Sequence, residues 1–475
     1  MTAAKTTSFL IALAYAFGSA QAAELPALAS GTLSGKVTSA QFRAGATADD
    51  SSSFADQFNP NTPISVVAEI QTEAAHVGTS GNLYTVALVG SQAFMQDATG
   101  TFNSWDLNPA TLVAREENRI LAEVEQLAPI SNLALGPLGL AGASLSFYFA
   151  YGSASAPGEL FYNSTALALI LEDYSPLSLT YATEQIIDTT ILDTGRNREI
   201  PVLIYLSSEP GPSPTLLFSH GLGGDRFAVG YLAEQWSQRG FNVINLQHPG
   251  SDSSIVEGIA ASEILAAFES AASLENSIAR IEDVSAVLDQ LELWNAEIGN
   301  QFYQRIDFNR IGMSGHSFGA RTTQSVSGQA GGAIPGSTRD PRIKAAVIFS
   351  PSPPGLGDAN AAFAQVDIPW MLMTGTLDDS GITDVTPEQR TEVYPALPPG
   401  GKYELVLFEG EHHAFTDRDL SPSQAARNPA HHPQIQALTT AFWEAWLRDD
   451  ISARDWLDGT GAESVLQPGD GWQFK

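Results

Sequence analysis

The sequence contains no cysteine among its 475 residues, so disulfides and thiolate chemistry are excluded. Basic residues are also scarce: 23 Lys and Arg stand against 53 Asp and Glu, which gives a formal net charge of −30 at pH 7. A surface with this charge repels nucleic acids and anionic membranes. We therefore expect no nucleic-acid partner.

Signals for metals and cofactors are missing as well. The pair His412-His413 has no third ligand at helical spacing, as a zinc site would need. The glycine-rich run Gly221-Leu222-Gly223-Gly224 has no following lysine, as a phosphate-binding loop would need. We predict neither a metal nor a cofactor.

Apolar runs of the ~20 residues that a membrane span requires are absent. The N-terminus has Lys5, then a short apolar run over residues 9–17, then the small residues Ala20-Gln21-Ala22. This order is typical of a secretory signal peptide, with cleavage expected after Ala22. We predict residues 1–22 as a signal peptide and the mature protein as secreted or periplasmic, without an integral membrane segment.

The chain is too long for one hydrophobic core, because cores stop growing near ~250–300 residues. Residues 23–58 are rich in small and polar residues and are predicted to be a flexible lead-in. Residues 59–175 contain short β-like runs between turn residues, which predicts a smaller β-rich, sandwich-like accessory domain. The stretch 114–127 could instead be a helix, which would make this domain α+β.

Residues 176–450 alternate strand-like and helix-like segments. This alternation predicts an α/β domain with a mostly parallel sheet flanked by helices. Strands are expected at 215–218, 241–246, 310–313, 343–349, 370–374 and 403–408. Helices are expected at 227–239 and 435–447, and a further helical stretch is expected to end near residue 294. The segment 254–274 could be a helical lid or an ordinary packing helix, and residues 451–475 are predicted to be a C-terminal tail.

The motif Gly315-His316-Ser317-Phe318-Gly319 carries the strongest chemical signal. A nucleophilic serine above a parallel sheet stands on a strained turn between a strand and a helix, and flanking glycines avoid collisions there. An apolar strand-like run precedes the motif and a helix-like run follows it. We therefore predict Ser317 as a catalytic nucleophile.

A serine hydroxyl attacks when a histidine takes its proton and a carboxylate orients that histidine. Both partners follow the serine along the chain in this type of sheet. Asp378 ends the run Gly375-Thr376-Leu377-Asp378 that follows the strand at 370–374, and the short turn Gly375-Thr376 would bring it back over the strand end. We prefer it as the acid over Asp379 and Asp358.

The doublet His412-His413 follows the strand at 403–408, at the edge where open α/β sheets place their ligands. One of the two is expected to be a solvated loop residue. We assign that role to His412 and predict His413 as the general base.

The oxyanion of an ester intermediate needs two backbone N–H donors. We expect the N–H of Phe318 and that of Leu222, which lies in the glycine-rich loop after the strand at 215–218. His220 and Gly221 are expected near the pocket, with His220 shaping the loop. His248 and Asp252, just beyond a strand end, would either border the pocket or brace a loop.

Three stretches resemble one family: Phe218-Ser-His-Gly-Leu-Gly-Gly224, Gln247-His-Pro-Gly-Ser-Asp252 and Gly315-His-Ser-Phe-Gly319. They are similar to the branch of bacterial α/β-hydrolases that includes platelet-activating-factor acetylhydrolase, chlorophyllase and dienelactone-hydrolase-like serine esterases. The similarity covers roughly residues 180–450 and implies an α/β-hydrolase fold and carboxylic-ester hydrolysis. The acetylhydrolase acid follows the sixth strand, where this chain has Ser350-Pro-Ser-Pro-Pro354, and dienelactone hydrolase itself uses a cysteine.

The sequence thus leads us to expect a secreted serine hydrolase that cleaves carboxylic esters through an acyl-enzyme. One alternative is a polyester, lipid-ester or lactone hydrolase with the same triad. Another is a polymer-binding protein whose N-terminal domain is the main functional unit. The substrate, small or polymeric, and the oligomeric state are left open.

Overall fold

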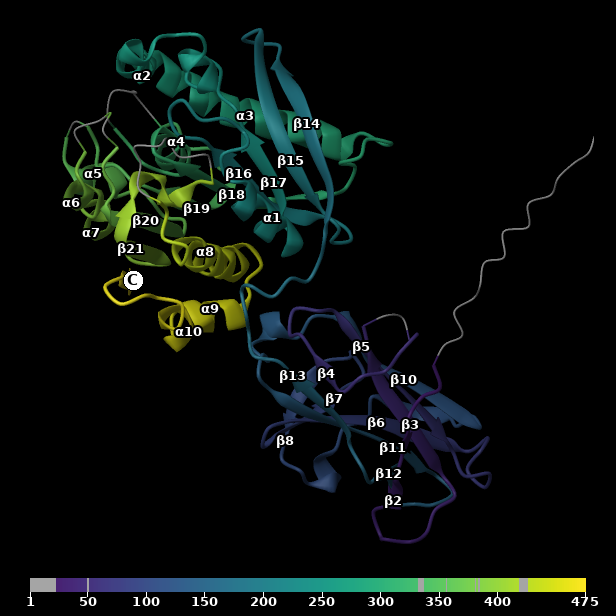
Figure 1. Cartoon of the computed structure of the whole chain (residues 1–475). Coiled ribbons are helices and arrows are strands. Elements are labelled where there is room, and N and C mark those ends of the chain that lie inside the picture. The colour runs from purple at the N-terminus through teal and green to yellow at the C-terminus, as the bar shows by residue number, and fades with distance from the viewer. Residues whose placement is uncertain are drawn as a thin grey trace, which may run out of the picture. The chain divides into compact units, whose positions relative to one another are not determined.

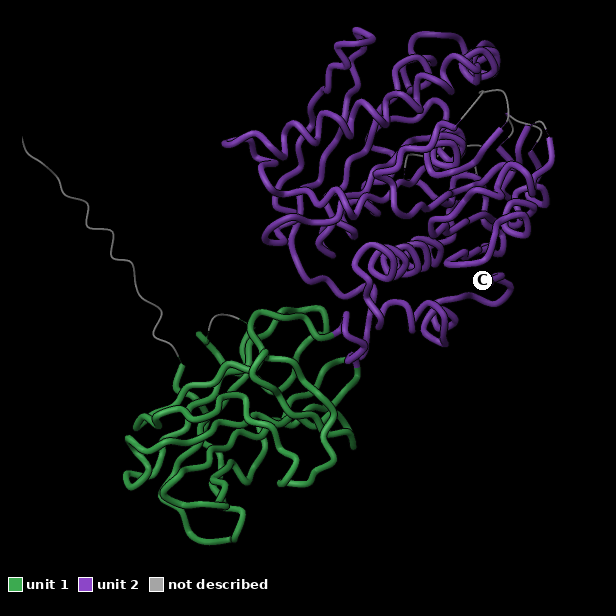
Figure 2. The backbone as a smooth tube through the Cα atoms, turned by 180° about the vertical axis from the view of Figure 1, so that it is seen from behind, with its two compact units in different colours: residues 1–135, 142–172 green, residues 136–141, 173–475 purple. Residues whose placement is uncertain are grey.

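The computed structural model describes residues 23–48, 51–331, 337–355, 357–380, 382, 385–417 and 426–475. The predicted signal peptide lies outside the described residues. Two compact units make up the chain (Figure 2): unit 1 is residues 1–135 and 142–172, and unit 2 is residues 136–141 and 173–475. The chain therefore passes between the units three times, and each unit is described by itself.

Unit 1 is built from two β-sheets (Figure 1). A four-stranded antiparallel sheet has the order β1-β3-β5-β10, and a nine-stranded sheet follows the path β2-β12-β11-β6-β7-β8, with β13, β9 and β4 paired beside it. The strands are β1 (Ala27–Leu28), β2 (Ser30–Thr32), β3 (Gln41–Thr47), β4 (Gln57–Phe58), β5 (Ile64–Gln71), β6 (Ser80–Val89), β7 (Gln92–Gln96), β8 (Phe102–Trp105), β9 (Glu116–Ile120), β10 (Val124–Leu133), β11 (Ser144–Ser153), β12 (Phe161–Asn163) and β13 (Leu167–Leu171), with a 3₁₀ turn η1 (Pro109–Thr111).

The core of unit 1 follows from the two-residue period of its strands. In β11 the buried positions Phe147 and Phe149 alternate with half-buried ones, and in β5 Val66 and Ala68 do the same. Alternate side chains of a strand point to opposite faces of the sheet. Because β11 contacts β5, the two apolar faces pack against each other as in a sandwich.

One prediction for unit 1 is wrong, and one alternative left open is excluded. The lead-in predicted at 23–58 contains β1, β2, β3 and β4, and Phe42 of β3 is buried in the core. The helix considered at 114–127 is replaced by β9 and the start of β10, which pairs with β5. Two of the alternate buried positions of β3 are the small residues Ala44 and Ala46, so a search for large apolar side chains missed its strand period.

Unit 2 contains one nine-stranded sheet in the order β14-β15-β17-β16-β18-β19-β20-β21-β22. The strands from β17 to β21 run parallel, and β14, β15 and β22 pair antiparallel at the two edges. The bounds are β14 (Thr183–Asp193), β15 (Arg198–Ser207), β16 (Ser213–Ser219), β17 (Asn242–Leu246), β18 (Ile306–His316), β19 (Ile343–Phe349), β20 (Trp370–Leu377), β21 (Lys402–Glu411) and β22 (Gly471–Phe474).

Helices connect the strands of unit 2. They are α1 (Gly230–Gln238), α2 (Ile264–Ala271), α3 (Leu274–Ala296), α4 (Phe318–Val326), α5 (Ala359–Phe363), α6 (Pro387–Arg390), α7 (Val393–Ala396), α8 (His431–Leu447), α9 (Ile451–Leu457) and α10 (Thr460–Glu463), with 3₁₀ turns η2 (Gly136–Leu138), η3 (Ser253–Val256), η4 (Ala261–Glu263) and η5 (His412–Phe415). Within the described part of the chain, no helix combines the length and the apolar character needed to cross a membrane.

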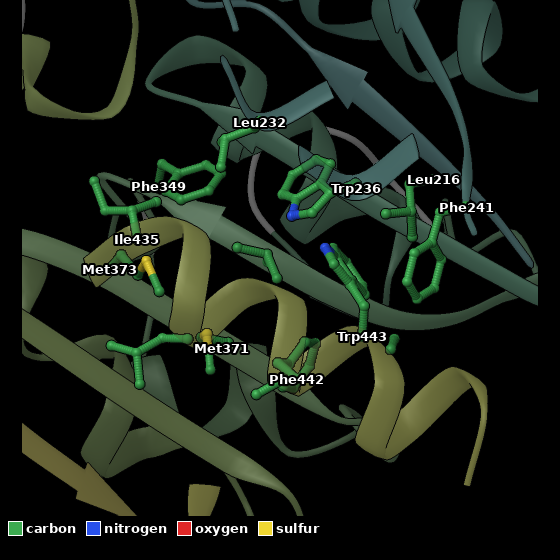
Figure 3. Close-up of a cluster of buried hydrophobic side chains, with 14 of the residues drawn as sticks. Leu216, Leu232, Trp236, Phe241, Phe349, Met371, Met373, Ile435, Phe442 and Trp443 are labelled. Atoms are coloured by element: carbon green, nitrogen blue, oxygen red, sulfur yellow. The ribbon is translucent and has the colours of Figure 1, made fainter. Parts of the chain in front are cut away.

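The sheet of unit 2 has a hydrophobic core on each face. One core joins residues of α1 and α8 to the strands, and Figure 3 shows Trp236 of α1 close to Trp443 of α8, with ring centroids 5.9 Å apart. The other core joins α3, α4 and α5 to the opposite face. Every residue of β16 is buried, as expected for a central strand that is covered on both sides.

The predicted C-terminal tail at 451–475 is also wrong. Ala453 and Leu457 of α9 are fully buried, and β22 pairs antiparallel with β21. Residues to the end of the chain therefore complete the sheet and one of its cores. The molecule as a whole is of mixed α/β content with large, partly parallel sheets.

Candidate active site

Ser317 occupies the turn between β18 and α4. Its backbone has φ 56° and ψ −112°, an uncommon conformation for a residue with a side chain. Its N–H donates to the carbonyl of Phe349 at the end of β19, over 3.0 Å. The turn therefore lifts the serine away from the helix and holds it at the carboxyl edge of the parallel strands.

Close backbone approach explains the two glycines of the motif. A Cβ at Gly319 would lie 1.9 Å from the carbonyl oxygen of Ser219, and a Cβ at Gly315 would lie 2.4 Å from the carbonyl oxygen of Gly319. These distances are far below any real contact. Only glycine allows α4 to start this close to the end of β16.

His412 connects the serine to a carboxylate. Its Nε2 lies 2.9 Å from Oγ of Ser317, and its Nδ1 lies 2.6 Å from Oδ1 of Asp378. Ser317 and His412 are partly exposed, whereas Asp378 is fully buried. The three side chains thus form one hydrogen-bonded chain that runs from the interior to the surface.

The surroundings of Asp378 favour its ionised form. Burial alone would raise the pKa of this carboxyl, but the hydrogen bond and charge of His412 and the charge of Arg390 lower it to about 2. Thr374 also donates its hydroxyl to Oδ2 over 2.8 Å, and Arg390 Nε lies 3.2 Å from Oδ1. An ionised Asp378 can only accept, so Nδ1 of His412 carries a proton and Nε2 is left to accept from Ser317.

The prediction of His413 as the histidine beside Ser317 is wrong. Nδ1 of His413 lies 3.3 Å from a carboxylate oxygen of Glu411, and it is His412 that reaches Ser317. β21 ends at Glu411 and the 3₁₀ turn η5 begins at His412. Successive residues of a 3₁₀ turn point about 120° apart, so only one histidine of the doublet can face the serine.

The two carboxylates that were not preferred as the acid, Asp379 and Asp358, lie elsewhere. Asp379 is exposed, and the carboxylate of Asp358 caps α5 by accepting from the N–H of Ala361 over 2.9 Å. Of the three candidate carboxylates, Asp378 is the one that the structure brings to His412.

His316, beside the nucleophile, supports the site from behind. It is buried, and its Nε2 donates to the carbonyl oxygen of His412 over 2.8 Å. Burial, with the neighbouring His412, holds the pKa of His316 well below its usual value, so its ring is neutral. This contact fixes the backbone that carries the His412 ring, a role that sequence reasoning missed.

The loop after β16 lies next to Ser317. A Cβ at Gly221 would lie 3.4 Å from Cβ of Ser317 and 3.2 Å from Nδ1 of His316. Among the described residues, the N–H groups of Leu222 and Phe318 have no hydrogen-bond acceptor. Both donors predicted for an oxyanion are therefore on segments adjacent to Ser317 and are available to a ligand.

Three residues near this loop are buried behind it, in agreement with the loop-shaping role predicted for His220 and the loop-bracing alternative for His248 and Asp252. His220 and His248 are fully buried and Asp252 nearly so. His220 accepts the N–H of His248 at Nε2 over 3.0 Å, and its Nδ1 contacts the carbonyl oxygen of Gly221 at 2.6 Å. Asp252 accepts from Gln247 over 2.7 Å. They brace the loop and do not line an open pocket, because their polar atoms bind the protein itself.

A second Ser-His-Asp chain lies in this buried region. His248 Nε2 is 2.9 Å from Oγ of Ser219, and its Nδ1 is 3.0 Å from Oδ2 of Asp283. All three are fully buried. Burial, followed by the charge of Arg280, lowers the pKa of His248 to about 4. A substrate cannot reach these three buried side chains, so we assign them a structural role. Their hydrogen bonds connect α3 to the end of β16, which carries the glycine-rich loop.

Arg280 links the same network to the site. Its guanidinium donates to the carbonyl oxygen of His220 over 2.6 Å and to the hydroxyl of Ser251 over 2.8 Å, and it lies 4.6 Å from the ring centroid of Phe318. Burial lowers its pKa to about 9, so it stays charged at neutral pH. Arg280 therefore contacts both segments that carry the candidate oxyanion donors.

The helix α2 lies against the glycine-rich loop. A Cβ at Gly223 would lie 2.3 Å from the ring of Phe268 of α2, and Gly223 has φ 67°. Within α2 only Ala271 is buried. The segment 254–274, considered as a lid or a packing helix, thus contacts the loop next to Ser317 but shares little of the core.

Comparison of the chain with protein-family models and with curated proteins finds no match. The resemblance to the esterase branch therefore stays a prediction from the quoted motifs. What the chain can do chemically has to be argued from the geometry of Ser317, His412 and Asp378.

Proposed function

We propose that unit 2 is an α/β-hydrolase that cleaves carboxylic esters through an acyl-enzyme on Ser317. The observation that carries this proposal is the continuous contact from Asp378 through His412 to Ser317, at the carboxyl edge of a parallel sheet. The strained backbone of Ser317 supports it, because a nucleophile on such a turn is presented to a ligand.

In this proposal Oγ of Ser317 attacks the ester carbonyl carbon while its proton moves to Nε2 of His412. Ionised Asp378 stabilises the imidazolium that results. The N–H groups of Leu222 and Phe318 bind the oxyanion. His412 then protonates the departing alcohol, and a water molecule, deprotonated by His412, releases the acid and restores the serine hydroxyl.

Fluorophosphonate labelling of the full chain, followed by peptide mapping, tests the nucleophile. We expect the label on the peptide that contains Ser317 and none on Ser219, because Ser219 is fully buried although it also belongs to a Ser-His-Asp chain. Labelling of Ser219, or none at Ser317, would contradict the proposal.

Hydrolysis of p-nitrophenyl butyrate tests the reaction. Ser317→Ala should abolish turnover with the fold retained, since the substituted side chain only loses one oxygen. Ser285→Ala is a suitable control, because the hydroxyl of Ser285 on α3 makes only a long contact, 3.3 Å, to Asp340 within the described residues, and the substitution keeps the backbone carbonyl. Undiminished hydrolysis by Ser317→Ala would refute the proposal.

A further inference from the structure

Unit 1 carries an apolar hollow on the solvent side of its larger sheet. Its lining includes Tyr84 and Val86 of β6, Tyr148 of β11, Tyr162 of β12, and Trp105 and Leu107, with a volume of about 340 Å³. We call it the tyrosine groove. The solvent face of an antiparallel sheet is ordinarily polar, so a concave apolar face there marks a binding site.

The loop that forms one wall of the groove is held in place by its own hydrogen bonds. Nε1 of Trp105 donates to the carbonyl oxygen of Asn108 over 3.1 Å and to the hydroxyl of Thr111 over 3.2 Å. Leu107 has φ 62° and is 58% exposed. The loop therefore presents an apolar side chain to solvent from a backbone conformation that leucine rarely adopts, with the groove already formed.

The groove continues into a second hollow of about 530 Å³, which shares Tyr84 and adds Asn82, Asn118 and Glu159. Two of the side-chain acceptors here already have partners: Oδ1 of Asn82 accepts the N–H of Asn118, and Glu159 accepts both the N–H and the hydroxyl of Ser34. A ligand rich in hydroxyl donors, such as an oligosaccharide, therefore has to compete with these two bonds at this end.

Hydrogen-bond donors, by contrast, are available along the groove. Tyr84 accepts the amide of Asn82 over 3.3 Å, which leaves its own proton to donate. The hydroxyls of Tyr148 and Tyr162 have no partner within the described residues. A matching ligand offers acceptor oxygens and an apolar chain, and an ester offers both.

The charges around the two hollows restrict the class of ligand further. Among the described residues, no lysine, arginine or histidine lines either hollow, and Glu159 is the one charged residue in the two linings. The whole chain has a net charge of −30. Anionic ligands such as free fatty acids are therefore disfavoured. We propose that the tyrosine groove binds an uncharged ester by its alkyl or aryl chain, as a site separate from Ser317 that does not depend on the function proposed for unit 2.

Titration calorimetry of methyl octanoate binding to the full-length Ser317→Ala protein tests this proposal. Hydrolysis at Ser317 is then absent, so the result does not depend on catalysis. We expect a negative heat-capacity change from apolar burial and binding of octanoate weaker by at least about tenfold, because its carboxylate meets a negative surface. Equal binding of octanoate, or preferential binding of cellohexaose, would overturn the proposal.

Two groove variants in the same background locate the site. Trp105→Ala should weaken methyl octanoate binding by roughly a hundredfold and Leu107→Asn by roughly tenfold, as expected for lost apolar anchors. Asparagine tolerates positive φ, so Leu107→Asn keeps the loop conformation even if Trp105→Ala does not fold. Ile170→Ser, at a residue of β13 that is 53% exposed and outside the groove, is the control. Unchanged affinity in Leu107→Asn, or an equal loss in Ile170→Ser, would overturn the proposal.

Discussion

The adjacent histidines His412 and His413 offer a sharp test of the active site, because they differ by one position in the chain. His412 lies 2.9 Å from Ser317 and 2.6 Å from Asp378. His413 pairs with Glu411 at 3.3 Å instead. Replacement of each by glutamine gives two proteins of identical composition that should behave very differently.

His412→Gln should lower kcat for p-nitrophenyl butyrate by about 10⁴-fold, or about 5 kcal/mol in activation free energy, as expected when the general base of a triad is lost. Glutamine cannot take the serine proton, whereas the oxyanion donors are left in place. The residual rate should therefore stay above that of the uncatalysed reaction.

His413→Gln should change kcat by less than about threefold, because its partly exposed contact with Glu411 contributes below about 1 kcal/mol. Initial rates over a range of substrate concentrations, with far-UV circular dichroism as the check on folding, measure both variants. If His413→Gln were inactive while His412→Gln kept its rate, the catalytic reasoning built on these contacts would be refuted.

Two further predictions concern the buried charges. The folded pKa of Asp378 is about 2, below its usual 3.8, so the stability that ionised Asp378 contributes is present above about pH 4 and is lost as pH falls towards 2. In urea unfolding at several pH values, the free energy of unfolding of Asp378→Asn should therefore fall less at low pH than that of the unmodified protein. An equal fall in both proteins would count against this prediction. Asp283→Asn should lower the free energy of unfolding by about 2–3 kcal/mol, since the fully buried carboxylate of Asp283 contacts the partly exposed Arg196 and Arg198 and the ring of His248. A loss under about 1 kcal/mol in urea unfolding would contradict this.

Local pattern predicted much of unit 2. The strand expected at 343–349 coincides with β19, and the strand expected at 370–374 is the first part of β20. These segments are continuous apolar runs between turn residues, so their length and composition carry the information. Asp378 was preferred over Asp379 because of an expected turn at Gly375-Thr376, whereas β20 continues to Leu377 and Asp378 is the first residue after it.

The predictions failed where the structure of a segment depends on a one-residue shift in register or on a partner far away in the sequence. Whether His412 or His413 faces Ser317 depends on where β21 stops, and one residue of shift reverses the answer. Residues 23–58 and 451–475 look like a lead-in and a tail because their apolar residues are few. Their strands are stabilised by partners far along the chain, as in the pairing of β22 with β21.

The network behind the glycine-rich loop brings together residues from three elements, and no single motif contains it. One signal was nevertheless present in the sequence: Arg280 and Asp283 fall on the same face of α3 as Val284 and Val287, which form its buried stripe. A charged side chain in such a stripe must find a partner, because burial of a lone charge is too costly. Charged residues that interrupt the apolar face of a helix therefore point to buried networks, and here that network contacts the two segments that carry the candidate oxyanion donors.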